Sequence, residues 1–182
     1  MKANFLLRLA TDSDIPALET LIVISARALM APYYSSAQIE AAIGPVFGVD
    51  HQLIRDRTYF VAECEKLLVG CGGWSRRKAL FGGDLHRAGE DVLLDPRYDS
   101  ARIRAFFTHP AWARRGIGRS ILAASESAIR ASGFHRVELV ATLAGEPLYA
   151  TFDYSPGERY EVAISGNLTL PVVRMTKRFS SV

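Results

Sequence analysis

Short apolar runs alternate with amphipathic stretches along this chain, and their spacing predicts the secondary structure. Runs rich in branched and aromatic residues predict strands, and apolar positions three and four residues apart predict helices. We expect strands at residues 5–9, 58–64, 67–74, 103–107, 136–141, 160–164 and 170–177. We expect helices at residues 16–28, 36–43, 117–130 and 145–152, with one or two further helical turns at 50–56.

The order of these elements predicts the fold class. A hairpin precedes the central strand–helix unit and another follows it, which indicates an α/β (α+β) fold with a mixed sheet flanked by helices. Its 182 residues suit one domain, and we expect that domain to span residues 1–182. Residues 76–100 form a long charged insertion. Loops of this length inside a domain are usually functional or mobile, and a solvated hairpin is the alternative interpretation.

The central stretch, residues 102–130, combines a strand, a glycine turn and a helix. The strand stops at His109-Pro110, because proline has no amide hydrogen to give to a sheet. The turn that follows contains Gly116 and Gly118. Its basic residues are Arg114, Arg115 and Arg119. Unpartnered amides at a helix start attract anions, so a pyrophosphate is the suggested ligand, and a helix with a merely solvated basic end is the alternative.

The segment THPAWARRGIGRSIL resembles motif A of the GNAT superfamily, the acyl-CoA-dependent N-acetyltransferases. Gly116 and Gly118 match the small positions of that motif, whereas Ala113 stands where the family usually has Gln or Arg. The similarity runs from Leu7 to Lys177. It implies a GNAT-like, mostly antiparallel sheet that is splayed beside the central strand. It also implies acetyl-CoA as cosubstrate.

The resemblance implies how coenzyme A would be held. In that family the amides of the turn bind the pyrophosphate and the preceding strand pairs with the pantetheine arm. The implied binding residues are Phe106, Phe107, Thr108, Arg114, Arg115, Gly116, Ile117, Gly118 and Arg119. Phe106 and Thr108 share one backbone edge because they are two residues apart. An amide near Phe107 or Thr108 is the candidate donor to the thioester carbonyl.

The resemblance also implies a general acid. Residues 148–154, LYATFDY, correspond to a family stretch in which a tyrosine protonates the leaving thiolate, and Tyr149 falls on that tyrosine. Asp153 replaces the usual glycine and Tyr154 the usual phenylalanine. A tyrosine that only packs in the core is the alternative interpretation of Tyr149.

The general base stays open between Glu63, His109 and a chain of water molecules. The ordinary role of Glu63 would be a surface position on a strand, and that of His109 a helix cap. The sequence offers no Ser-His-Asp or Cys-His arrangement, which favours direct transfer in a ternary complex over a covalent acyl-enzyme.

The acceptor is expected to be a primary amine on a small molecule or a peptide. Its pocket would be built from the first helices, the 76–100 insertion and the final hairpin, with Tyr33 and Tyr34 either touching substrate or packing in the core. Two alternatives remain: a non-catalytic acyl-CoA sensor of the same fold, and a nucleic-acid-binding domain using residues 112–115. The absence of interleaved aromatic and basic residues argues against the second.

Composition and charge indicate the kind of ligand and the cellular compartment that suit this chain. A net charge of +3 and a pI of about 9.0 suit an anionic cofactor without requiring nucleic acid. Cys64 and Cys71 lie in apolar runs and predict buried free thiols, with no metal site. The apolar stretch at 21–26 is too short to span a membrane, and the N-terminus lacks a signal-peptide pattern. We therefore expect a cytoplasmic protein, and an exposed last strand suggests a homodimer.

Overall fold

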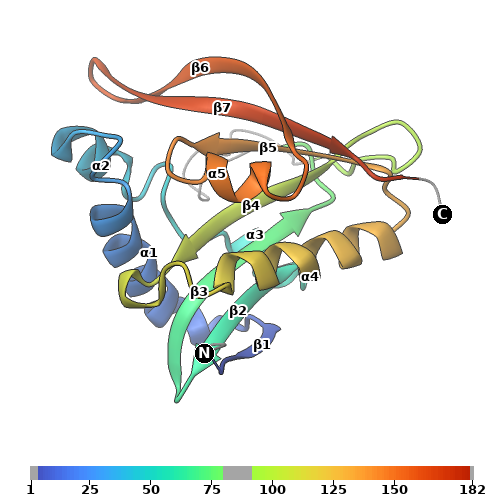
Figure 1. Ribbon diagram of the computed structural model, residues 1–182, viewed down its shortest axis with the longest axis horizontal. Helices are drawn as coiled ribbons and strands as arrows, with labels where there is room; N and C mark the ends of the chain where they lie inside the picture. Colours follow the sequence, from blue (N-terminus) through green and yellow to red (C-terminus); the bar gives the residue numbers. More distant parts are fainter. Residues whose placement is uncertain (1–3, 80–91, 181–182) are drawn as a thin grey trace.

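The computed structural model describes residues 4–79 and 92–180. Its strands form one seven-stranded sheet in the order β1-β2-β3-β4-β5-β7-β6 (Figure 1). The strands are β1 (Leu6–Leu9), β2 (Tyr59–Cys64), β3 (Leu67–Ser75), β4 (Ala101–Thr108), β5 (Arg136–Thr142), β6 (Ser155–Ser165) and β7 (Leu168–Arg178). Neighbouring strands are antiparallel except β4 and β5, which are parallel. The predicted mixed, mostly antiparallel sheet is confirmed.

Helices cover both faces of this sheet. They are α1 (Ile15–Leu29), α2 (Ser36–Ala42), α3 (His51–Arg55), α4 (Ile117–Ala131) and α5 (Glu146–Ala150), with short 3-10 turns η1 (Asp12–Asp14) and η3 (Pro110–Trp112). Val61 of β2 shares a core cluster with Leu18 of α1, whereas the adjacent Ala62 shares one with Ile117 and Ile121 of α4. Because adjacent strand residues point to opposite faces, α1 and α4 lie on opposite sides of the sheet. Figure 1 shows α4 crossing β2 and β3.

The observed elements differ from the predicted ones at a few ends. α2 is capped by Ser35 rather than Ser36, since the Ser35 hydroxyl accepts from the Gln38 amide at 3.2 Å. β6 begins at Ser155, five residues before the predicted start. The last strand, β7, lies between β5 and β6, so the exposed edge at this end of the sheet is β6. Pairing of two subunits, which stays a prediction, would therefore use β6 and not the last strand.

β4 and β5 separate soon after they begin to pair. Their parallel register contains Ala101 opposite Val137 and Arg102 opposite Glu138. An ion pair between Arg102 and Glu138 ties the strands together at the second of these positions. Beyond it the sheet splays, leaving backbone edges of β4 open.

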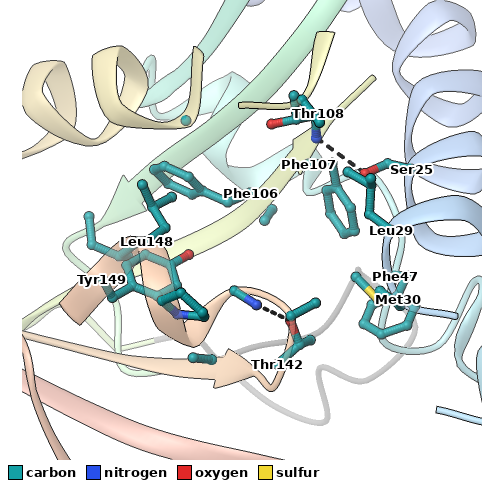
Figure 2. Close-up of a pocket in the computed structure, with 18 of the residues that line it drawn as sticks. Ser25, Leu29, Met30, Phe47, Phe106, Phe107, Thr108, Thr142, Leu148 and Tyr149 are labelled. Atoms are coloured by element: carbon teal, nitrogen blue, oxygen red, sulfur yellow. Dashed lines mark hydrogen bonds between the residues drawn. The ribbon is translucent and has the colours of Figure 1, made fainter. Parts of the chain in front are cut away.

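A bulge in β4 sets the direction of the residues that follow. Ala105 has a φ of 57°, in the left-handed region that costs a non-glycine residue about 1–2 kcal/mol. The register between β3 and β4 shifts at this point, between Cys71 and Gly73. Phe106 points toward α5 and Phe107 toward α1 (Figure 2), because consecutive strand residues point to opposite faces. The bulge shifts the register by one residue, so it decides which ring lies on which side of the opening.

The described residues contain free thiols and no long apolar helix. Cys71 is buried and Cys64 half-buried, and neither forms a disulfide with the other. Burial raises the pKa of the Cys71 thiol to about 12, so this thiol stays protonated. Within residues 4–79 and 92–180, no helix has the length and apolar character needed to cross a bilayer.

Candidate active site

A pocket of about 700 Å³ lies where β4 and β5 diverge (Figure 2). One end is bounded by α5 and by the turn before α4, through residues such as Gly116, Gly118 and Tyr149. The other end is bounded by the end of α1, the segment before α3 and the β6–β7 hairpin. The end of α1 and the final hairpin line it as predicted, whereas no residue of α2 does. Of the wall predicted at 76–100, residues 76–79 and 92–100 do not line the pocket, and residues 80–91 lie outside the described residues.

The turn before α4 presents main-chain donors to this pocket. Gly116 caps α4 with a φ of 87°, a conformation that favours glycine. The first amide satisfied by the helix is that of Ser120, which donates to the Gly116 carbonyl at 2.9 Å. The amides of residues 114–119 have no acceptor in the described part of the chain. A Cβ added at Gly116 would meet nothing within 4 Å, so the backbone of the turn is uncovered at this residue.

Gly118 has a different reason to be glycine. A Cβ at this position would lie 3.1 Å from Leu148 Cδ2, tighter than ordinary contact. Gly118 therefore lets α5 approach the first turn of α4, which brings Tyr149 toward the same pocket. A bulky residue at Gly118 would displace α5 as well as any ligand.

The arginines of the turn divide between pocket and surface. Arg114 and Arg119 line the pocket, and the Arg119 guanidinium lies 5.2 Å from the centre of the Phe152 ring. Arg115 lies over Trp112 at 5.1 Å and does not line the pocket. Positive charge at this end of the pocket therefore comes from Arg114 and Arg119.

The open edge of β4 is formed by Phe106 and Thr108. His109 donates its amide to the Val69 carbonyl at 2.9 Å, so the backbone groups of His109 and Phe107 face β3. Those of Thr108 and Phe106, which alternate with them, face the opening. The Thr108 amide already donates to Ser25 Oγ of α1 at 3.2 Å (Figure 2). The Thr108 amide, one of the two candidate donors to the thioester carbonyl, is therefore engaged within the protein. The Phe106 edge is the part of β4 left for a ligand.

Tyr149 is buried at the α5 end of the pocket. Its ring meets the Phe106 and Tyr154 rings edge-on, with centroids 6.0 and 5.9 Å apart. Burial raises the pKa of Tyr149 above its ordinary value of 10.0, so the hydroxyl holds its proton at neutral pH. Figure 2 shows the residue reaching from α5 toward β4.

The family model of the "Acetyltransferase (GNAT) domain" matches residues 55–156. The chain belongs to this family. The match includes β4, the glycine turn, α4 and α5, so it covers the pocket end just described. No curated protein sequence matches the chain.

Solved structures share the GNAT fold over nearly the whole chain. A GCN5-related N-acetyltransferase from Rhodopseudomonas palustris is 22% identical with a TM-score of 0.72, and 98% of each chain is covered. The PaiA N-acetyltransferase from Thermoplasma acidophilum, in complex with coenzyme A, is 13% identical with a TM-score of 0.66, covering 97% and 100%. YncA from Salmonella typhimurium, a putative acetyltransferase with acetyl-CoA, is 16% identical with a TM-score of 0.60, covering 99% and 96%. At these identities the likeness shows the fold alone.

Neither side-chain candidate for the general base lies in the pocket of this GNAT domain. The Glu63 carboxylate accepts from Arg8 Nε at 2.9 Å and Nη2 at 2.7 Å, on the β1–β2 side of the sheet. His109 Nδ1 accepts from the Ala111 amide at 3.2 Å and so caps η3. Neither residue is among the pocket lining. Their observed roles are structural.

The Arg8 cluster gives a pH-dependent prediction. Arg8 donates to both Asp14 oxygens at 2.8 Å and holds the pKa of Asp14 at about 2, against an ordinary 3.8. A lowered folded-state pKa means stability that is present above pH 3.8 and lost as the pH falls through 2. Asp14→Asn should lower the free energy of unfolding at neutral pH by about 1–2 kcal/mol and flatten its decline in acid. Urea titrations between pH 2 and 7 measure this.

Asp12→Asn is the matched control, because Asp12 is the exposed neighbour in the same turn. It should change the free energy of unfolding by no more than about 0.5 kcal/mol. An acid decline that is as steep in Asp14→Asn as in the parent protein would contradict the assignment.

The structure places further residues in the GNAT pocket that the sequence did not single out. Ser25 lies within the helix predicted at residues 16–28, and nothing local marks it as a partner of Thr108. Asp50 and Arg104 meet as a buried ion pair from segments far apart in the chain. Tyr33 lines the pocket, whereas the Tyr34 hydroxyl donates to the Pro171 carbonyl and accepts from the Leu143 amide, both at 2.8 Å.

Proposed function

We propose that this protein is an acetyl-CoA-dependent N-acetyltransferase that acts on a primary amine by direct transfer in a ternary complex. The observation that carries the proposal is the convergence of three features on one pocket. Open amides precede α4, an unpaired backbone edge runs along β4 at Phe106, and the buried Tyr149 lines the same pocket. A pyrophosphate, an amide-bearing arm and a leaving sulfur would need donors of these kinds.

The residues present fit coenzyme A. The amides of residues 114–119 would bind the pyrophosphate, with Arg114 and Arg119 adding charge. Ile117 would contribute only its amide, because its side chain is buried in the core. Phe106 would contribute its backbone edge. The GNAT motif also implies coenzyme A binding by Phe107, Thr108, Arg115 and Gly118. Their contacts within the protein are those given for the candidate active site.

Tyr149 would serve as general acid. Acetyl-CoA supplies the acetyl group as a thioester. Tyr149 gives a proton to the sulfur as the carbon–sulfur bond breaks and the amine nitrogen bonds to the acetyl carbon. With Glu63 and His109 outside the pocket, water is the remaining route by which the amine loses its proton. Holding both reactants in one pocket supplies most of the acceleration.

Wider aspects of the proposal come from the sequence. The domain is proposed to span residues 1–182 and to work in the cytoplasm with a small-molecule or peptide amine. A non-catalytic acyl-CoA sensor is the second candidate, favoured because neither Glu63 nor His109 lines the pocket and because Asp50, the acidic residue among the described lining, is held in an ion pair with Arg104. Calorimetry with acetyl-CoA and thiol release with a panel of amines separate the two: the sensor binds acetyl-CoA without releasing thiol. Absence of acetyl-CoA binding would contradict both.

Removing charge from the turn tests the pyrophosphate assignment. Arg114→Ala/Arg119→Ala should weaken acetyl-CoA binding about tenfold, because these exposed arginines contribute about 0.5–1 kcal/mol each. The loss should shrink at high salt. Arg55→Ala/Arg178→Ala removes the same charge from exposed positions that do not line the pocket, and should leave the affinity unchanged. Equal losses in both variants, measured by calorimetry, would contradict a local role.

A further inference from the structure

The end of the pocket opposite the glycine turn is mostly apolar, with the buried Asp50–Arg104 ion pair as its charged part. Phe107 turns away from Tyr149 and packs edge-on against Phe47, with ring centroids 6.0 Å apart (Figure 2). Around these rings lie side chains from α1 and the β6–β7 hairpin. The apolar side chains of this end, which we call the acceptor end, are Leu29, Met30, Phe47, Phe107, Leu170 and Val172.

Among the residues that the structure describes, the acceptor end offers no carboxylate that is free to pair with a second cation. Of the described residues that line the pocket, Asp50 is the one with an acidic side chain. Asp50 is buried and forms an ion pair with Arg104, and its Oδ1 accepts from the Leu53 amide at 3.2 Å. Its charge is balanced inside the protein. A ligand ammonium placed among the apolar residues would lose its hydration without a compensating partner.

From these observations we propose that the acceptor is a monoamine whose body is an apolar chain or ring. This inference rests on the proposed function and specifies its substrate. The amine nitrogen lies toward Tyr149 and the opening of β4, and the apolar body fills the acceptor end. Diamines and polyamines are excluded by the cost of burying their second charge, and short hydroxylated amines gain little from burial.

A chain-length series tests the proposal on the unmodified protein. Thiol release is measured with acetyl-CoA and ethyl-, propyl-, butyl- and pentylamine. Each added methylene should raise kcat/KM about fourfold while it remains buried. Pentylamine and 1,4-diaminobutane have similar lengths and differ in an apolar or a charged far end. Pentylamine should be preferred at least tenfold. A flat series, or a preference for the diamine, would overturn the proposal while leaving the transferase function intact.

A charge placed in the acceptor end should change this preference. Leu29 is half-buried near the end of α1 and lines the pocket, so Leu29→Asp adds a carboxylate there. We expect the ratio of kcat/KM for pentylamine to that for 1,4-diaminobutane to fall at least tenfold. Ile24→Asp is the matched control, since Ile24 is an exposed residue of the same helix outside the pocket lining. An unchanged ratio in Leu29→Asp, or an equal fall in Ile24→Asp, would count against the proposal.

A binding measurement separates failure of this inference from failure of the proposed function. Calorimetry follows pentylamine and 1,4-diaminobutane as each binds to the protein saturated with coenzyme A, which has no acetyl group to transfer. Tighter binding of pentylamine supports the apolar acceptor end even if no thiol is released in the assay. In that case the proposed acetyl transfer is rejected, and the proposal that the ligand is an apolar monoamine is retained. Equal or weaker binding of pentylamine overturns the ligand class, whatever the activity.

Discussion

Arg104→Met should lower the free energy of unfolding by about 3–5 kcal/mol, the range expected when one partner of a buried ion pair is removed. The Arg104 and Asp50 side chains are each only 1% exposed. Without the guanidinium, the Asp50 carboxylate stays buried beside Phe47 and α3, and it keeps the Leu53 amide as a partner that only partly offsets the lost ion pair. Denaturant titrations of the protein without ligands measure the change.

Two companion variants make this result specific. Arg159→Met removes an exposed arginine that pairs with Glu146, and should cost no more than about 1 kcal/mol. Arg104→Met/Asp50→Asn removes the buried charge as well and should recover part of the loss, because the remaining groups are neutral. A double variant less stable than Arg104→Met would mean that Asp50 matters mainly through something other than its charge.

The parts of the fold predicted from the sequence are those encoded by local patterns. The glycine turn is one such part, because Gly116 needs a positive φ and the apolar spacing of α4 begins directly after it. The hairpin of β2 and β3 is another, since only two residues separate its apolar runs. Its turn residues, Glu65 and Lys66, adopt positive φ values that these residue types do not favour, so the spacing of the runs and not the turn chemistry predicts this hairpin.

The features that were missed depend on contacts between distant segments. The bulge at Ala105 contains no glycine that would predict it from the sequence. The φ of 57° at Ala105 is maintained by the surrounding sheet. Likewise, the hydrogen bond from Thr108 to Ser25 joins β4 to α1, and sequence spacing says nothing about that distance. The acceptor end of the pocket is built from four such segments, so its chemistry appears only when they are brought together.

Gly118 has a packing role in the structure that its place in the motif does not predict. Gly118 matched a pattern associated with phosphate binding, yet its immediate neighbour is Leu148 of α5. A replacement such as Gly118→Trp would move α5 and Tyr149 together with the turn, so weak acetyl-CoA binding by that variant would have two explanations. Changes at Arg114 and Arg119 avoid this ambiguity because both side chains are exposed.

Tyr149→Phe should lower kcat about a hundredfold, at the lower end of the range for general acid catalysis. The phenylalanine ring keeps the edge-on contacts with Phe106 and Tyr154, so the fold and the affinity for acetyl-CoA should be retained. Tyr160→Phe is the control, because Tyr160 lies on β6 outside the pocket lining. Thiol-release kinetics with a saturating apolar amine, together with calorimetry, measure both effects.

The pH dependence separates proton donation from packing. A thiol has a pKa of roughly 8.5, so its thiolate needs less help from an acid as the pH rises above that value. Burial keeps the Tyr149 hydroxyl protonated over the same range, because its pKa is raised. The ratio of parent kcat to Tyr149→Phe kcat should therefore be largest near pH 7 and shrink toward pH 9. A ratio that stays constant with pH would indicate that Tyr149 only positions its neighbours, and a ratio near one throughout would leave it a packed core residue.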